Sequence, residues 1–231
     1  MTRRDYDIHG VVSLAVFGNG PVLDRLRLEL GRFETARALP QPDVVVRPLG
    51  WARAPAGALA CSGASPVRYL VAARAVELWY QDEPAAGRRI YGPLLVALAT
   101  ALRRRGAFLL HAAALRVDGP GVVLVGPRGS GTTATACAHL AQGAGYVGED
   151  KVVLAGGHVH LLQTLVSLRP YHRPLLPEVA RRAVRDAPAR RLVAAVAAAV
   201  LPAALARRLG PAARSRVAPE ATSSAMRPSP A

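Results

Sequence analysis

The sequence contains a single lysine, Lys151, although lysine and arginine together number 30. Aspartate and glutamate total 15, so the formal net charge is +15, and arginine supplies nearly all of the positive charge. So basic a chain suits a polyanionic partner such as nucleic acid, anionic lipid, a nucleotide or an acidic peptide. A composition rich in arginine, alanine, glycine and proline is also typical of a GC-rich genome, so the charge alone does not decide function.

Aromatic residues and cysteines are scarce as well. Aromatics make up 5% of the chain, and no array of arginines and aromatics appears. Surfaces that bind single-stranded nucleic acid combine both kinds of side chain, so the sequence argues against nucleic acid as a partner. The two cysteines, Cys61 and Cys137, form no CxxC pair, which argues against a metal site or a disulfide framework.

Long hydrophobic runs are also missing. The longest, residues 192–206, is interrupted by Pro202 and is shorter than the roughly 20 apolar residues that a membrane-spanning helix needs. The first ten residues lack the apolar segment of a signal peptide. We therefore predict a cytoplasmic protein without a membrane partner, with attachment to a membrane surface kept as an alternative.

The first third of the chain predicts a small α+β lobe over residues 1–85. Strand-forming residues occupy 6–17 up to the turn Gly18-Asn19-Gly20, and they recur at 43–48 and 67–80. Apolar residues at helical spacing predict a helix over 21–33. We find no catalytic constellation in this region.

A P-loop kinase-like domain is predicted over residues 86–210. Its sequence order is strand, glycine-rich loop, helix and strand, which is the βαβ arrangement that a P-loop requires. The strand before the loop is fully apolar, so we expect a buried parallel strand there. The predicted elements are a helix over 88–106, a strand over 107–115, a strand over 122–125, a helix over 133–143 and a strand over 146–154.

The last third is rich in arginine and alanine. We predict helices over 177–191 and 192–209, with arginines on their exposed faces. Residues 211–231, rich in proline, serine and alanine, are predicted to be a disordered tail. The fold class we expect is α/β: a P-loop nucleotide-binding core with a small N-terminal α+β lobe and a C-terminal helical segment.

The glycine-rich loop matches the pattern G-x-x-x-x-G-K-[ST] except at the lysine. Its glycines let backbone N–H groups surround a phosphate, and the following helix directs its positive end to the same place. The last residue, Thr133, would direct its hydroxyl to Mg²⁺. The alternative is a glycine-rich turn without a ligand. The matching residues are Gly126, Pro127, Arg128, Gly129, Ser130, Gly131, Thr132 and Thr133.

Thr132 occupies the lysine position of that pattern. The usual lysine reaches the β- and γ-phosphates and neutralises charge during transfer. A threonine can donate a hydrogen bond but supplies no charge, whereas Arg128 could supply some with a different geometry. The loop is therefore expected to bind nucleotide, with phosphoryl transfer impaired if no other cation acts.

Two adjacent carboxylates, Glu149 and Asp150, are the second candidate feature. On a strand they would point to opposite faces, so one could reach the loop. A carboxylate there can hold Mg²⁺ or accept a proton from an attacking hydroxyl. The alternative is a solvated strand end, in which Lys151 is merely an ion-pair partner. His111, before the loop strand, is a further candidate, although a lone histidine is more often structural.

The stretch from Leu109 to Leu154 resembles the catalytic core of HPr kinase/phosphorylase and the HPr-kinase-related proteins of bacteria. That family combines a histidine-bearing strand, a turn, a P-loop, a helix and an acidic pair. The resemblance extends more loosely to the whole chain, because related proteins also carry a small N-terminal lobe. Some members accompany peptide natural-product clusters, including those of lasso peptides, and phosphorylate a serine of the precursor.

The resemblance implies roles for particular residues. Residues 126–133 would bind the triphosphate of ATP, with Thr133 and Asp150 as Mg²⁺ contacts. Glu149, Asp150 and His111 would be the catalytic residues, with a carboxylate as the proton acceptor. Two departures from the family pattern are Thr132 in place of lysine and Glu149 in place of the first aspartate. The family's downstream substrate loop has no clear counterpart, although residues 167–174 lie about where it should be.

The leading hypothesis is an ATP-dependent kinase that acts on a serine, threonine or other small hydroxyl of a peptide or protein, with ATP and Mg²⁺ bound. A nucleotide-binding pseudokinase that serves as a scaffold is the alternative. A third hypothesis is an arginine-rich protein that binds nucleic acid or a membrane surface and has a vestigial loop. Family members are often oligomeric, so a homo-oligomer is an expected state.

Overall fold

The computed structural model describes residues 1–49, 57–60, 67–81, 83–127, 129–162, 166–168 and 215–217. The described chain is mixed α/β, with several sheets and few helices. Its contacts divide it into two units, Met1–Leu109 with Val153–Gly157, and Leu110–Val152 with His158–Ala231. We call them the N-terminal unit and the loop-bearing unit.

The N-terminal unit contains a seven-stranded mixed sheet in the order β3-β1-β2-β4-β7-β6-β5. Its central strands β2, β4 and β7 are parallel, and the outer pairs are antiparallel. The strands are β1 (Thr2–Ile8), β2 (Val12–Gly18), β3 (Glu34–Thr35), β4 (Val44–Pro48), β5 (Leu59–Ala60), β6 (Val67–Val71) and β7 (Val76–Tyr80).

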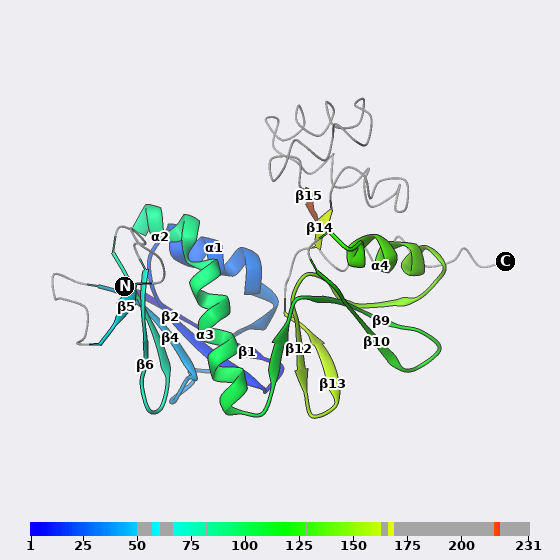
Figure 1. The fold of residues 1–231 in the computed structure, drawn as a ribbon. Coiled ribbons are helices and arrows are strands. Elements are labelled where there is room, and N and C mark those ends of the chain that lie inside the picture. The colour runs from blue at the N-terminus through cyan, green and yellow to red at the C-terminus, as the bar shows by residue number, and fades with distance from the viewer. Residues whose placement is uncertain are drawn as a thin grey trace. The chain divides into compact units, whose positions relative to one another are not determined.

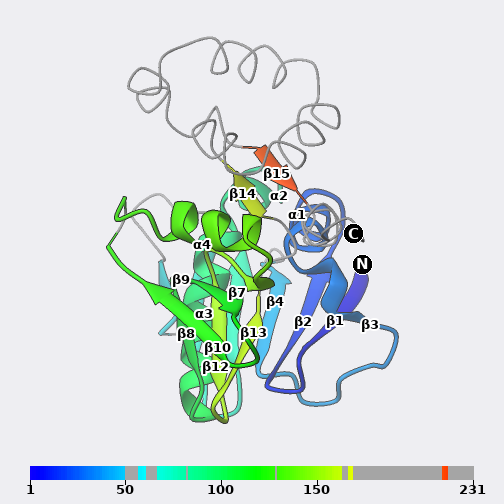
Figure 2. The same ribbon diagram turned by 90° about the vertical axis from the view of Figure 1, so that its right-hand side faces the viewer.

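Three helices and a 3₁₀ turn accompany this sheet, and Figures 1 and 2 show the helices on one of its faces. The fully buried residues of β4 and β7 alternate along the strands, whereas consecutive residues of β2 are buried on both faces. The elements are α1 (Pro21–Leu30), η1 (Gly31–Phe33), α2 (Glu83–Arg89) and α3 (Tyr91–Arg104). The apolar stripe of α3 that packs on the sheet comprises Leu94, Ala97, Leu98, Ala101 and Leu102.

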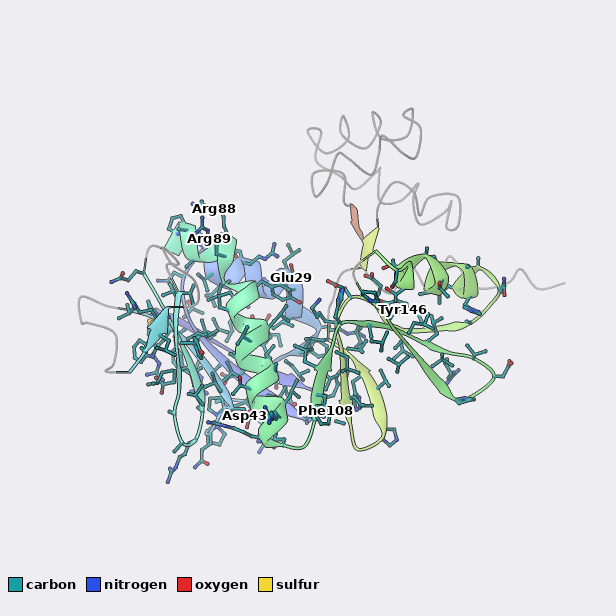
Figure 3. The ribbon with its side chains drawn as sticks, in the orientation of Figure 1. Glu29, Asp43, Arg88, Arg89, Phe108 and Tyr146 are labelled. Carbon is teal, nitrogen blue, oxygen red and sulfur yellow. The ribbon has the colours of Figure 1, made fainter. Side chains whose placement is uncertain are left out.

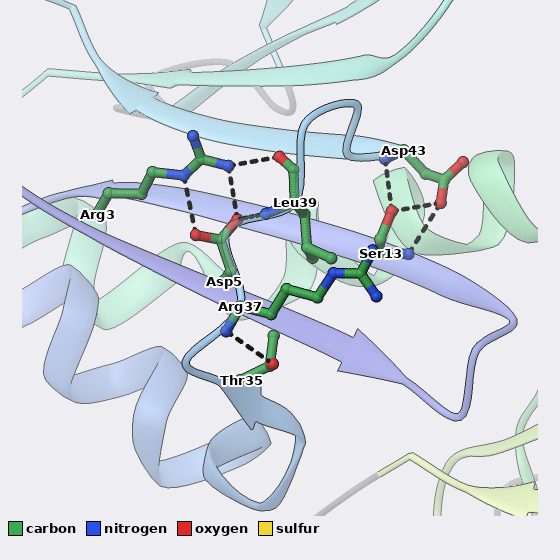
Figure 4. A network of polar contacts seen from close by, with 7 residues as sticks. All are labelled: Arg3, Asp5, Ser13, Thr35, Arg37, Leu39 and Asp43. Carbon is green, nitrogen blue, oxygen red and sulfur yellow. Dashed lines mark hydrogen bonds and ion pairs between the residues drawn. The ribbon is translucent and has the colours of Figure 1, made fainter.

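Several charged side chains of this unit form ion pairs and hydrogen bonds. Figure 3 labels Glu29 on α1, which is buried and forms an ion pair with Arg25 one turn earlier, at 2.6 Å. In Figure 4, Asp43 accepts hydrogen bonds from the backbone N–H and hydroxyl of Ser13, at 2.9 and 2.7 Å. Asp43 also forms an ion pair with Arg105, which follows α3. These contacts tie β2, the start of β4 and the end of α3 together.

The loop-bearing unit contains a three-stranded antiparallel sheet in the order β10-β9-β11. The strands are β9 (Ala112–Arg116), β10 (Gly121–Val125) and β11 (Gly145–Gly148), and α4 (Thr132–Ala141) connects the last two. Alternate residues of β9 face opposite sides. Ala113 and Leu115 pack with Ala136 and Leu140 of α4. Ala112 and Ala114 pack with Val152 on the other side.

The remaining strands are short. β8 (Phe108–Leu110), β12 (Val152–Ala155) and β13 (His158–Leu161) form a sheet in the order β13-β12-β8. β14 (Val166–Leu168) pairs with β15 (Ser215–Val217), which falls within the segment predicted as a tail. The predicted helices over 177–191 and 192–209, and the rest of the tail, lie outside the described residues. In the described chain, no helix is both long enough and apolar enough to cross a membrane.

Several sequence predictions differ from the structure in the N-terminal unit. Residues 6–17 are not one extended segment, because His9 and Gly10 have φ of 58° and 68° and turn the chain between β1 and β2. The predicted helix over 88–106 corresponds to α3, and α2, which lies almost entirely before residue 88, was not predicted. The contact boundary falls at 109/110 rather than 85/86, because α3 packs on the sheet of the N-terminal unit.

The strand before the glycine-rich loop was predicted to be a buried parallel strand, and this prediction was wrong. β10 is the edge strand of its sheet and pairs antiparallel with β9. Its residues are exposed or half-buried, and Val125 keeps 68% of its surface exposed. A continuous apolar run cannot distinguish a central strand from an edge strand, because both can be rich in β-branched residues.

Gly87 in α2 provides a test of helix packing in the N-terminal unit. A Cβ at this position would lie 2.7–2.8 Å from Cβ and backbone atoms of Pro21, which begins α1. Gly87→Ala should therefore lower the free energy of unfolding by about 1–3 kcal/mol in a urea titration, since backbone must move.

The matched control is Gly92→Ala in α3, where a Cβ would meet nothing within 4 Å. This change should raise the free energy of unfolding by up to about 1 kcal/mol, because alanine favours helix more than glycine does. Equal effects of the two substitutions would contradict the close packing of α1 and α2.

Candidate functional site

The strand register places the candidate residues at one edge of the β10-β9-β11 sheet, the edge formed by the ends of β10 and β11 and the start of β9. Val125, the last residue of β10, pairs with Ala112, the first residue of β9. Gly148, the last residue of β11, pairs with Ala114. The residue before β9, His111, and the residues after the two flanking strands, Gly126 and Glu149, therefore share this edge.

A glycine-rich loop, residues 126–131, leads from β10 into α4. Gly129 and Gly131 have φ of 90° and 93°, a region that residues with a side chain rarely adopt. Gly126 lies so close to Ser130 that a Cβ would be 2.3 Å from the serine Oγ. The loop conformation thus depends on glycine at these positions. Arg128 lies outside the described residues.

The first turn of α4 points its backbone N–H groups toward the loop, as at any helix N-terminus. Gly131 is the N-cap, and no side chain caps the helix. The hydroxyl of Thr133, in this first turn, does not cap the helix and donates a hydrogen bond to Oε1 of Glu149 at 2.7 Å. Glu149 is buried, with 7% of its surface exposed. The helix start and the end of β11 are thereby joined by a hydroxyl-carboxylate pair.

A second polar cluster consists of His111, Asp150 and Lys151. The Nδ1 atom of His111 lies 2.9 Å from Oδ1 of Asp150 and 2.8 Å from its carbonyl oxygen. The ammonium of Lys151 lies 2.8 Å from Oδ1 of Asp150 and 3.0 Å from Nδ1 of His111. The histidine side chain is 57% exposed, so this cluster opens to solvent, whereas Glu149 does not.

The chain turns sharply between β11 and β12. Asp150 has a φ of 67°, and the N–H of Lys151 donates to the carbonyl of Glu149 at 2.8 Å. The predicted single strand over 146–154 is therefore wrong, since β11 ends at Gly148 and β12 begins at Val152. The two carboxylates consequently diverge because of a turn, not because of strand alternation. Glu149 contacts the first turn of α4, and Asp150 contacts His111 and Lys151.

Cys137 lies in α4 one turn after Thr133 and is buried. Burial, together with the negative charge of Glu149, raises the pKa of its thiol from 9.0 to about 12. The buried carboxylate therefore acts electrostatically on the helix interior as well as on Thr133. The thiol remains protonated and unreactive at neutral pH.

The structure brings together most residues that the sequence nominated. Thr133 contacts Glu149, and His111 contacts Asp150, while the glycine-rich loop begins at the same sheet edge. Of the two residues predicted to contact Mg²⁺, Thr133 donates to Glu149, and Asp150 contacts His111 and Lys151. The contact of Lys151 with His111 was not foreseen; the available signal was that the chain has one lysine and it follows the acidic pair.

Comparisons with known proteins add nothing to this geometry. No model of a protein family matches the chain, and no curated protein matches it either. In the described part of the chain, no group of three or more histidine, cysteine, aspartate or glutamate side chains could hold a metal ion without another kind of ligand.

The raised pKa of Cys137 gives a direct test of its surroundings. In a Cys61→Ser background, which leaves one thiol, native protein at pH 8.5 should react with iodoacetamide up to roughly a thousandfold more slowly than urea-unfolded protein. The reason is that only the thiolate reacts, and a pKa near 12 leaves very little of it. Mass spectrometry of timed samples measures the rate, and Cys137→Ala is the blank. Similar rates in the two states would contradict a buried, protonated thiol.

Proposed function

We propose that the chain is an ATP-dependent kinase of the HPr-kinase-related type, which phosphorylates a hydroxyl of a peptide or protein. The observation that carries this proposal is the hydrogen bond from the Thr133 hydroxyl to the Glu149 carboxylate, at 2.7 Å. It joins the first turn after a glycine-rich loop to the end of the neighbouring strand. In P-loop enzymes, a hydroxyl and a carboxylate from these two places hold Mg²⁺.

The residues at this edge fit a nucleotide phosphate. Positive φ at Gly129 and Gly131 supports a loop whose backbone N–H groups can turn inward toward an anion. The helix N-terminus after the loop carries partial positive charge and has no side-chain cap. A glycine-rich turn without a ligand would not need the strand register that brings the ends of β10 and β11 beside the start of β9. It would also not need the buried Glu149 as the partner of Thr133.

The residues also fit Mg²⁺, which prefers oxygen ligands and keeps several of its waters. Thr133 and Glu149 offer a hydroxyl and a carboxylate oxygen side by side, and phosphate oxygens would complete the set. Bound Mg²⁺ would neutralise negative charge on the phosphates of ATP. We therefore assign Glu149 to the metal side of the site, and Thr133 with it.

Asp150 is then the proton acceptor in the proposed reaction. The substrate hydroxyl oxygen forms a bond to the γ-phosphorus of ATP, the bond from that phosphorus to the ADP oxygen breaks, and the hydroxyl proton passes to the Asp150 carboxylate. Its neighbour His111 is largely exposed, so an external hydroxyl can reach this side of the site. His111 would orient the carboxylate through its contact at 2.9 Å.

A nucleotide-binding pseudokinase is the second candidate, and one observation favours it. Thr132 stands where the P-loop lysine belongs, so the first turn of α4 lacks the usual positive charge. Charge stabilisation matters most in the transition state, so binding would survive this loss better than transfer. Nucleotide binding without any turnover would therefore support the scaffold role.

Nucleotide binding is tested by thermal or urea unfolding with and without Mg²⁺ and ATP. Ligand at 100 times its Kd should raise the free energy of unfolding by about 2.7 kcal/mol, because it binds only folded protein. Gly131→Val should abolish this gain, since valine cannot adopt a φ of 93° without strain and the N–H cradle would distort.

Gly143→Val is the matched control, because Gly143 follows the same helix with a φ of 96° and equally open surroundings. Both substitutions should destabilise the protein by about 1–3 kcal/mol, yet only Gly131→Val should remove the response to nucleotide. The proposal fails if wild-type protein shows no response at millimolar ATP.

Phosphoryl transfer is tested with radiolabelled ATP and serine-containing peptides. Thr133→Ala should lower the rate of transfer at least tenfold, because its side chain no longer offers an oxygen to Mg²⁺, and Thr133→Ser should retain most of it. Raising the Mg²⁺ concentration should partly restore Thr133→Ala. Equal rates for the alanine and serine variants would exclude the hydroxyl from the reaction.

A further inference from the structure

Lys151 is the only lysine in a chain with 30 basic residues, and its ammonium lies within the candidate site. It contacts Oδ1 of Asp150 at 2.8 Å, Nδ1 of His111 at 3.0 Å and the carbonyl of Asp150 at 3.2 Å. Only 19% of the side chain is exposed, so the stem is largely buried while the charge is held at the sheet edge. An ordinary surface cation is not held at three points.

Apart from His111, which contacts both Asp150 and Lys151, the other basic side chains described in the loop-bearing unit lie on β9, α4 and β13. Arg116 ends β9 and pairs with Gly121 and Gly145, at the opposite edge of the sheet. His139 lies in the last turn of α4. His158 and His160 lie on β13, with ring centroids 6.3 Å apart. Among these described side chains, Lys151 is the one that brings an ammonium group to the Asp150 carboxylate.

We propose that Lys151 supplies the positive charge for the nucleotide phosphates that Thr132 cannot supply, and so contacts them in the bound state. The inference rests on the proposed nucleotide site and goes beyond it, because it identifies the cation that takes the place of the missing P-loop lysine. The lysine that supplies the charge would thus lie not at the start of the helix after the loop but in the turn after β11. There it lies beside His111, the residue opposite the start of the loop in the strand register.

The contacts of Lys151 permit this role. The Nδ1 atom of a histidine cannot donate to Asp150 and accept from Lys151 at the same time. With the proton on Nδ1, His111 donates to Asp150, and its contact with Lys151 is the one that can be exchanged for a phosphate oxygen at little cost. Lysine suits such an exchange because its ammonium is a compact charge on a flexible stem. Its contact with Asp150 keeps the proton acceptor in position meanwhile.

A merely structural role makes different predictions. The ammonium contacts both the carboxylate and the carbonyl of Asp150, so it could simply hold that residue in its left-handed conformation. In that case its loss would disturb the turn and weaken all ligands alike. Arg128, inside the loop sequence, is the other candidate cation. The structural role is distinguished by how affinity depends on the number of phosphates, and the Arg128 alternative by a parallel Arg128→Ala variant.

The experiment compares the affinities of ATP with Mg²⁺, ADP with Mg²⁺ and adenosine by titration calorimetry on the full chain. Lys151→Met keeps a stem of similar length without charge. It should raise the Kd for ATP at least tenfold and change the Kd for adenosine less than twofold, with ADP between them. Thr132→Lys combined with Lys151→Met should restore ATP affinity to within threefold of wild type, since the charge returns to its usual position.

Thr132→Lys alone gives a test that does not require the Lys151 variant to fold. With Lys151 intact, the added lysine should improve ATP affinity less than threefold, because the charge is already present. A gain of tenfold or more would overturn the proposal. Equal losses of ATP and adenosine affinity in Lys151→Met would overturn it as well, and would leave Lys151 a structural role.

Arg128→Ala serves as the parallel variant. A loss selective for ATP in Arg128→Ala, with Lys151→Met unaffected, would assign the charge to Arg128 and overturn the inference. If wild-type protein binds ATP and Lys151→Met binds it equally well, only the proposed role of Lys151 is ruled out. Wild-type protein that binds no nucleotide removes the proposed function itself, so the two failures are distinguishable.

Discussion

The pairing of β9 with two strands that run opposite to it determines where the polar groups of the loop-bearing unit lie. Because β10 and β11 both run antiparallel to β9, their ends and the beginning of β9 meet at one sheet edge. The helix that joins the outer strands covers the central one through Ala136 and Leu140. This apolar contact fixes the helix start, and hence Thr133, within reach of Glu149. With a different strand register, the loop, His111 and the two carboxylates would not lie close together.

The two carboxylates differ in environment although they are neighbours in sequence. Glu149 is buried against α4, where its charge affects both the Thr133 hydroxyl and the Cys137 thiol. Asp150 is 30% exposed and shares its side of the turn with a histidine and a lysine. A buried carboxylate without partners would be costly, so the Thr133 hydroxyl stabilises Glu149 by donating to it. Different environments allow the two acids to serve different purposes.

Because apolar periodicity reflects which face is buried, sequence spacing predicted α1, α3, α4 and most strands, but it did not predict α2. It also nominated Thr133, Glu149, Asp150 and His111, which the structure brings together. It failed where a strand is interrupted. Nothing in the apolar run before the loop indicated that β10 would be an edge strand, because such a run occurs in central and edge strands alike. Among the described strands, β10 pairs only with β9, which precedes it in sequence. The turn at Asp150 was missed because a positive φ at a non-glycine residue has no compositional signature.

A chain that uses arginine for nearly all of its positive charge has an unusual chemical property. Reagents and enzymes that modify the lysine amine find only one side chain, and it lies within the candidate site. Acetylation there would remove a charge and a hydrogen-bond donor from the neighbourhood of Asp150. Arginines elsewhere would not be altered by the same reaction. The amine of Lys151 is thus the only side-chain amine in the sequence. A probe or a regulatory modification that reacts with lysine would attach at this site and at no other side chain.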